Sequence, residues 1–127
     1  PRSFPEGRIA QVASAWAAGM DDPLRLTVAG GKLFARIEAG SSWSTEGVTI
    51  LPGKWVHAAA VKAGAKLTLY VDGEARSSVA VPEEVWSQAS SVGLGGNPNY
   101  GGNEFLEADI SDFRLYARAL GAEEIRP

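Results

Sequence analysis

The sequence predicts an all-β protein built as an antiparallel sandwich or barrel. Apolar and polar residues alternate over runs of strand length, turn residues recur about every ten positions, and almost no segment has a helical pattern. The clearest stretch is a meander in which Trp55–Val61 and Lys66–Val71 are joined by Lys62–Ala65 and closed by Asp72-Gly73. Asp-Gly readily adopts the positive φ angles of a two-residue hairpin turn, so this stretch predicts adjacent antiparallel strands.

Composition limits the functional classes. The 127 residues fit one domain. With 12 Lys and Arg against 15 Asp and Glu, the net charge is -3, so the protein lacks the excess of basic residues expected of a protein that binds nucleic acid or an anionic membrane. With no Cys and a single His, His57, thiolate catalysis and Cys-based zinc sites are excluded and a Ser-His-Asp triad is disfavoured. No stretch approaches the ~20 apolar residues of a membrane span, so membrane insertion is not expected.

At the N-terminal end, residues 1–7 carry two prolines and a glycine and are expected to be a linker or lead-in, which places the domain at 8–127. Arg8–Met20 is ambiguous because its apolar residues fit a helical stripe, whereas Ile9–Ser14 also fits a strand. The hairpin that follows favours the strand.

That hairpin is read from two strictly alternating runs around Gly30-Gly31, Leu24–Val28 and Leu33–Glu38. Side chains on a strand point alternately to opposite faces, so one set from each run faces inward. The expected inward residues are Leu24, Leu26, Val28, Leu33, Ala35 and Ile37.

The remaining elements are shorter. Gly40–Gly47 is expected to be a polar loop, Gly95–Asn103 a glycine-rich loop, and Ala119–Ile125 a single helical turn. Strands are expected at Val48–Ile50, Ala75–Val81, Ser91–Leu94 and, last, within Phe105–Tyr116. The alternation predicts a core that contains Leu26, Leu33, Ile50, Trp55, Leu67, Leu69, Val71, Ile110, Phe113 and Leu115.

Three motifs carry a family resemblance. They stand in the order seen in LamG-like jelly-roll domains: Gly53–Ala59, then Leu69–Gly73, then Asp109–Leu120 together with Glu123–Ile125. The chain therefore resembles the laminin G-like branch of the concanavalin A-like lectin/glucanase superfamily. The resemblance covers roughly the C-terminal three fifths of the chain. It implies an antiparallel two-sheet jelly-roll sandwich, here N-terminally truncated, that serves as a non-catalytic, lectin-like module of a larger secreted or surface bacterial protein.

Carbohydrate recognition is the expected function, because sugars bind through apolar stacking on aromatic rings and hydrogen bonds from amide side chains. The expected glycan-binding residues are Trp43, Asn97, Asn99, Tyr100 and Asn103. Trp86 is a further aromatic candidate, although it follows the apolar Val85 and equally suits a core position. The alternative is a protein-interaction or structural assembly domain.

The resemblance also implies a structural calcium ion at the sandwich edge. Calcium takes six to eight oxygen ligands, and the carboxylates expected to supply them are Asp109, Asp21 and Asp22.

A less favoured alternative is a jelly-roll glycoside hydrolase that uses Glu107 and Asp109. The run Glu107–Asp112 resembles the E-x-D-x-x-E strand of such enzymes, in which two carboxyl groups stand about 5 Å apart in retaining hydrolysis. The third carboxylate of that motif is a Glu, whereas this chain has Asp112 there, with a shorter side chain. A solvated edge or a calcium ligand is the preferred interpretation, and no enzyme is expected.

Because the chain begins late relative to the family pattern, an open sheet edge is expected near the N-terminal strand. The segments Arg8–Ser14 and Leu24–Val28 together carry only two charges, Arg8 and Arg25. Charged side chains on an edge strand hinder pairing with another strand, so neither segment has much to prevent such pairing. Such an edge recruits a strand from the rest of the parent protein, from a second chain or from a partner.

Overall fold

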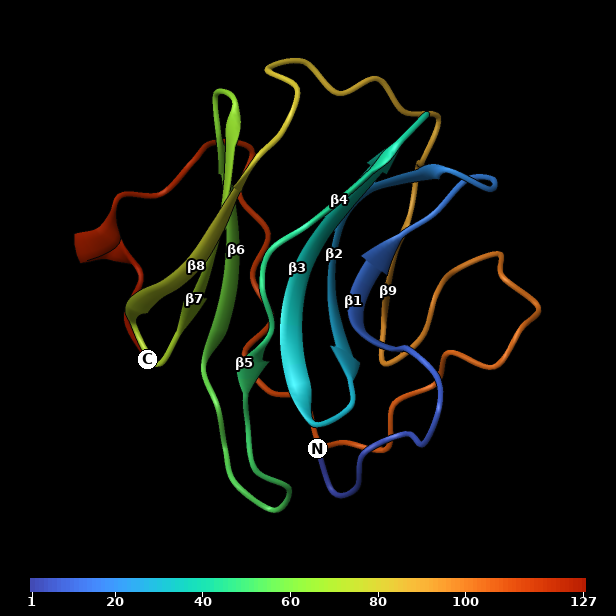
Figure 1. Ribbon diagram of the computed structural model, residues 1–127, viewed down its shortest axis with the longest axis vertical. Coiled ribbons are helices and arrows are strands. Elements are labelled where there is room, and N and C mark those ends of the chain that lie inside the picture. The colour runs from blue at the N-terminus through green and yellow to red at the C-terminus, as the bar shows by residue number, and fades with distance from the viewer.

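The computed structural model describes residues 1–127 as two antiparallel β-sheets packed face to face (Figure 1). A three-stranded sheet lies on the left of this view and a six-stranded sheet on the right. The predicted all-β, antiparallel sandwich is therefore confirmed. The protein has no helix with the length and apolar character needed to cross a membrane.

The six-stranded sheet contains the N-terminal strands and one late strand. Its order is β4-β3-β2-β1-β9, and β5 pairs with β3 beyond the end of β4. The strand predicted at Ile9–Ser14 is confirmed as β1, and the hairpin around Gly30-Gly31 as β2 and β3. The bounds are β1 Ala10–Ala15, β2 Asp21–Ala29, β3 Lys32–Ala39, β4 Ser42–Ser44, β5 Val48–Thr49 and β9 Val92–Leu94.

The three-stranded sheet is the predicted meander, with β6 at Ala58–Ala63, β7 at Lys66–Val71 and β8 at Glu74–Ala80 in the order β6-β7-β8. Asp72 and Gly73 have φ of 53° and 83°, the two positive angles that a primed turn requires. Past this sheet the chain forms one 3-10 turn, η1 at Ala122–Glu124, where a short helical turn is expected. Ile125, which follows it, is buried.

The core lies between the sheets. β2 and β3 contribute alternate residues, as expected from the hairpin pattern, and β7 contributes the fully buried Leu67 and Leu69. The buried cluster is Val28, Leu33, Ala35, Ile37, Ile50, Leu67, Leu69, Val71 and Val81. The predicted core positions Leu33, Ile50, Leu67, Leu69 and Val71 are confirmed, and Leu26 is half-buried against the cluster.

Trp55 is wrong as a core prediction. Its side chain is 72% exposed. Neighbouring side chains in an extended chain point to opposite faces, and Val56, Ala58 and Ala60 are the residues that contact the core. Trp55, one position before Val56, therefore points outward.

The predicted last strand is also wrong. Residues 105–116 form no strand, and Ile110, Phe113 and Leu115 are exposed rather than buried. Alternation favours a strand, but a strand needs a hydrogen-bonded neighbour. No backbone–backbone hydrogen bond in the structure involves a residue from 108 to 120.

The open edge expected near the N-terminal strand is not there. β2 lies between β1 and β3, and β1 lies between β2 and β9. β9 pairs with Ala13–Ala15, and the loop after β9 bonds to the preceding part of the same edge, through Gly95 to Val12 and Glu104 to Gln11. The loop predicted at Gly40–Gly47 likewise contains a short edge strand, β4. The long strands with a free edge are instead β6 and β8, which bound the three-stranded sheet and each pair only with β7.

Candidate functional site

The candidate site is an open groove at the end of the sandwich where β2 begins. The crossover from β8 to β9 passes over this end (top of Figure 1) and supplies half of the lining. The volume of the groove is about 460 Å³, within the range of small-ligand sites. The lining residues are Met20, Asp21, Gly40, Trp86, Ser87 and Gln88.

Asp21 holds the crossover in place. Its carboxylate accepts a hydrogen bond from the Ser87 hydroxyl and another, at 2.9 Å, from the backbone N–H of Gln88. The Ser87 hydroxyl in turn accepts the N–H of Ala89 at 2.9 Å. These bonds order the three residues after Trp86 and therefore fix the position from which its side chain projects.

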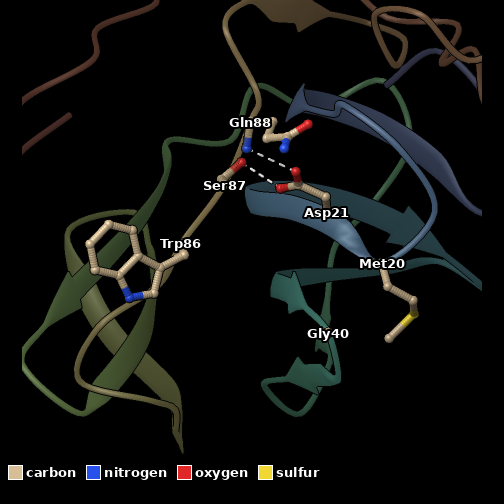
Figure 2. Close-up of a pocket in the computed structure, with 6 residues that line it drawn as sticks. All are labelled: Met20, Asp21, Gly40, Trp86, Ser87 and Gln88. Atoms are coloured by element: carbon tan, nitrogen blue, oxygen red, sulfur yellow. Dashed lines mark hydrogen bonds between the residues drawn. The ribbon is translucent and has the colours of Figure 1, made fainter.

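The two apolar side chains of the groove stand apart with polar groups between them. Figure 2 shows Trp86 and Met20 on opposite sides of Asp21, Ser87 and Gln88. Trp86 is 84% exposed, the highest value among the large apolar side chains that reach the surface, and Met20 is 43% exposed. The lining thus contains an indole ring that can stack on an apolar face, and a carboxylate, a hydroxyl and a primary amide that can form hydrogen bonds.

The structure does not bring the five predicted ligand residues together. Trp43 lies on β4 opposite Ile37 and is half-buried against the core. Its ring therefore contributes to packing between the sheets, whereas the other four residues lie on the loop Gly95–Leu106.

That loop folds onto the outer face of the six-stranded sheet, and its polar groups hold it there. Asn97 accepts from the Ser14 hydroxyl at 3.2 Å, Asn99 donates to the Trp16 carbonyl at 3.4 Å, and the Tyr100 ring packs against Trp16 at 5.8 Å between centroids. The backbone carbonyl of Asn103 accepts a weak bond from Arg8 at 3.4 Å. These contacts give the four residues a structural role, although Asn99, Tyr100 and Asn103 remain exposed.

A charged cluster is buried beneath this loop. Arg25 contacts Asp22 at 3.2 Å and Glu38 at 2.5 Å, and Gln11 donates to Glu104 at 2.7 Å. Burial, followed by the negative charges of Glu38 and Glu104, raises the pKa of Asp22 to about 6 although Arg25 opposes the shift. One oxygen of Asp22 and the Nε of Arg25 have no hydrogen-bond partner in the protein.

The three carboxylates expected to bind calcium each have another partner. Asp21 accepts from Ser87 and Gln88, Asp22 pairs with Arg25, and Asp109 forms a two-pronged contact with Arg2 at 2.8 and 3.0 Å. No three His, Cys, Asp or Glu side chains are grouped so as to hold a metal ion. The geometry therefore provides no preformed calcium site, and calcium binding stays a prediction.

Glu107 and Asp109, the carboxylates of the hydrolase alternative, lie on the exposed segment after the loop. Glu107 accepts from Ser3 at 2.8 Å, and the hydrogen bond from Arg2 holds the pKa of Asp109 below its usual value. Neither residue lines the groove. This arrangement gives the hydrolase no support.

A second hollow of about 330 Å³ lies on β7 and β8. It is lined by Lys66, Thr68, Ala75, Arg76, Ser77 and Ser78 and contains no aromatic residue. The groove at Trp86 is therefore the better candidate for a sugar.

Sequence reasoning identified Trp86 as an aromatic candidate but could not separate it from Trp43. The run Pro82-Glu83-Glu84 indicated that a strand ends before Trp86, but it did not indicate that the ring is exposed, because the neighbouring Val85 packs against the core. Asp21 was expected as a metal ligand, and its role in holding Ser87 and Gln88 depends on a contact across 66 positions.

Comparisons with known proteins agree with the fold. Residues 2–126 match the family model of the concanavalin A-like lectin/glucanases superfamily. A crystal structure of an S-layer domain-containing protein from Clostridium thermocellum is similar, with a TM-score of 0.50 and 23% identity, over 98% of this chain. This chain spans 65% of the length of that one. Among curated proteins, no sequence matches.

Proposed function

Because the chain belongs to the concanavalin A-like lectin/glucanases superfamily, we propose that it is a non-catalytic module that binds carbohydrate in the groove at Trp86. The observation that carries this proposal is the indole of Trp86, 84% exposed and positioned by the bonds from Ser87 and Gln88 to Asp21. A large apolar ring left in water by an ordered backbone is a surface suited to a ligand.

The groove offers two kinds of contact that a sugar ring uses. The apolar face of a pyranose can stack on the indole of Trp86, and its hydroxyls can exchange hydrogen bonds with the Gln88 amide and the free lone pairs of Asp21. An open groove rather than a closed cavity also suits an internal unit of a longer glycan chain, because both ends of the chain can leave the site.

The setting that we propose is a secreted or cell-surface bacterial protein. The similar crystal structure belongs to an S-layer domain-containing protein, a name that indicates the cell surface for that protein. Glycans of the cell envelope or of the surroundings are then the ligands within reach.

A glycan array identifies the ligand, and isothermal titration with the best glycan tests the site. Trp86→Ala should weaken binding at least about tenfold, because a stacked aromatic anchor is worth about 1.4 kcal/mol or more. Trp55→Ala is the matched control, since Trp55 is a similarly exposed tryptophan outside the groove. Both variants should melt within a few degrees of the wild type, because neither side chain is buried.

Two results would contradict the proposal. Equal affinity of the Trp86→Ala and Trp55→Ala variants would remove the groove as the glycan site. Absence of any bound glycan on a broad array would favour the second candidate function, a protein-interaction or assembly domain, which is supported by the free edge of β6.

A further inference from the structure

The β7–β8 hollow, of about 330 Å³, lies on the outer face of the three-stranded sheet. Leu67, Leu69 and Val71 of β7 are buried in the core, so the alternate residues Lys66 and Thr68 face outward. The hollow is lined by 6 residues of β7 and β8, none of which is aromatic or acidic. It therefore lacks the ring on which a sugar stacks, but it contains two cations and several hydroxyl groups.

The register of the two strands sets these cations on either side of a pair of hydroxyl groups. Thr68 is opposite Ser78. Lys66 precedes Thr68 by two residues on β7, and Arg76 precedes Ser78 by two residues on β8. Because the strands are antiparallel, the two cations lie on opposite sides of the hydroxyl pair, each about 7 Å along its strand. Their long side chains can therefore converge on one group bound above the pair.

A β-bulge determines how Arg76 enters the hollow. Leu69 pairs with Ser77, whereas the next residue of β7 pairs with Ala75, so one residue of β8 is left over. That residue is Arg76. In a regular strand two successive side chains point to opposite faces, whereas here Ala75 and Arg76 both line the hollow. Bulges are over-represented next to active sites, where they re-aim a side chain.

The polar groups of the hollow have no partners within the protein. None of the ion pairs includes Lys66 or Arg76. Thr68 is only 8% exposed and lines the hollow, and its hydroxyl forms no hydrogen bond within the protein. A hollow whose only charges are two unpaired cations is a local exception in a protein of net charge -3. Its ammonium, guanidinium and hydroxyl groups are donors that an oxyanion accepts.

We propose that the β7–β8 hollow binds an oxyanion of an acidic glycan, which is a carboxylate, sulfate or phosphate group. The guanidinium of Arg76 offers two parallel N–H donors, the ammonium of Lys66 approaches from the other side, and the Thr68 hydroxyl donates from the base. This inference rests on the proposed function, because it takes the charged group to be part of a glycan. It uses none of the residues that line the groove at Trp86.

The first experiment separates the charge of the ligand from its sugar backbone. Isothermal titration compares oligogalacturonate with its methyl ester, and dextran sulfate and dextran phosphate with plain dextran. Within each comparison the backbone is the same and only the oxyanions differ. The charged polymer should bind at least about tenfold more tightly than the neutral one, and the largest ratio identifies the preferred oxyanion.

Charge-matched variants then locate the site. Lys66→Gln combined with Arg76→Gln removes both cations of the hollow. Lys32→Gln combined with Lys54→Gln is the control, because it removes two exposed lysines elsewhere and changes the net charge equally. The first double variant should lose at least about tenfold in affinity for the charged polymer, and the control no more than about twofold. All four side chains are exposed, so both proteins should remain folded.

Thr68→Val tests the base of the hollow. The substitution replaces a hydroxyl that has no partner in the protein with a methyl group of similar size, so the melting temperature should stay the same or rise. Affinity for the charged polymer should fall by about threefold or more, because one donor is lost. A lower melting temperature with unchanged affinity would give Thr68 a structural role and remove it from the site.

The results for the hollow and for the groove can be told apart. Trp86→Ala should weaken charged and neutral polymers alike, so it changes absolute affinity and leaves their ratio unchanged. Equal binding of charged and neutral polymers, or equal losses in the two double variants, overturns the hollow as an oxyanion site whether or not Trp86→Ala has an effect. If inorganic phosphate shifts the amide signals of Thr68 and Ser78 in NMR spectra but no charged polymer binds, a glycan is excluded as the source of the oxyanion.

Discussion

Asp22 should make the protein less stable as the pH rises from acid to neutral. The carboxyl is buried beside Glu38 and Glu104, and its pKa in the folded protein is about 6. An unfolded aspartate has its ordinary pKa of about 3.8, so between these two pKa values the folded state binds more protons than the unfolded state. The free energy of unfolding therefore falls as the pH rises through this window and is constant above it. Asp22→Asn removes the titration.

The size of the effect follows from the pKa difference. About two units at 1.36 kcal/mol each amount to about 3 kcal/mol between the fully protonated and fully ionised limits. About 2 kcal/mol of this should appear between roughly pH 4.5 and pH 7. The ionised Asp22 thus lowers stability at neutral pH although it contacts Arg25 at 3.2 Å.

Urea unfolding across that pH range measures the effect in the wild type and in Asp22→Asn. The difference between the two curves should change by about 2 kcal/mol, whatever constant offset the new amide introduces. Glu124→Gln is the control, because hydrogen bonds from Arg118 and the Gly121 N–H lower the pKa of Glu124 to about 2. Its stabilising effect is present above the unfolded pKa and is lost only as the pH falls below about 4.5. A pH-independent difference between wild type and Asp22→Asn would refute the claim that burial dominates over Arg25.

Three further predictions can be checked by unfolding measurements. Leu69→Ala should lower the free energy of unfolding by about 2–5 kcal/mol, because Leu69 is fully buried. Leu115→Ala should lower it by less than about 0.5 kcal/mol, because Leu115 is 67% exposed. Similar losses in the two variants would mean that residues 108–120 pack against the protein in solution. Gly73→Ala should lower the free energy of unfolding by about 1 kcal/mol, since φ is 83° and a Cβ would lie 3.3 Å from the Ile125 carbonyl oxygen. An unchanged urea midpoint would argue against the primed turn. Calcium binding at Asp21, Asp22 or Asp109 predicts a melting temperature that rises with added calcium and falls with chelator, and coincident melts remove that prediction.

Local alternation was sufficient for the hairpins. A two-residue period sends alternate side chains to opposite faces whatever surrounds the strand, so Leu24–Val28 and Leu33–Glu38 revealed both their pairing and their inner face. Asp72-Gly73 and Gly30-Gly31 were equally informative, because positive φ is a property of the turn residues themselves.

Distant partners decided the rest. The run Phe105–Tyr116 has the residues of a strand, but from residue 108 onward it has no neighbour to bond with. Trp43 and Trp86 are both tryptophans in polar or irregular segments, although one packs on the core and the other projects into water. Asp22 has its raised pKa because Glu38 and Glu104 are brought beside it from other segments. The sequence by itself therefore determined which residues could pair and which face would be apolar, since both depend on neighbours within a few positions. Only the tertiary structure decided which edges pair, which rings are exposed and which carboxylates share a buried site, because those properties depend on residues that are far apart along the chain.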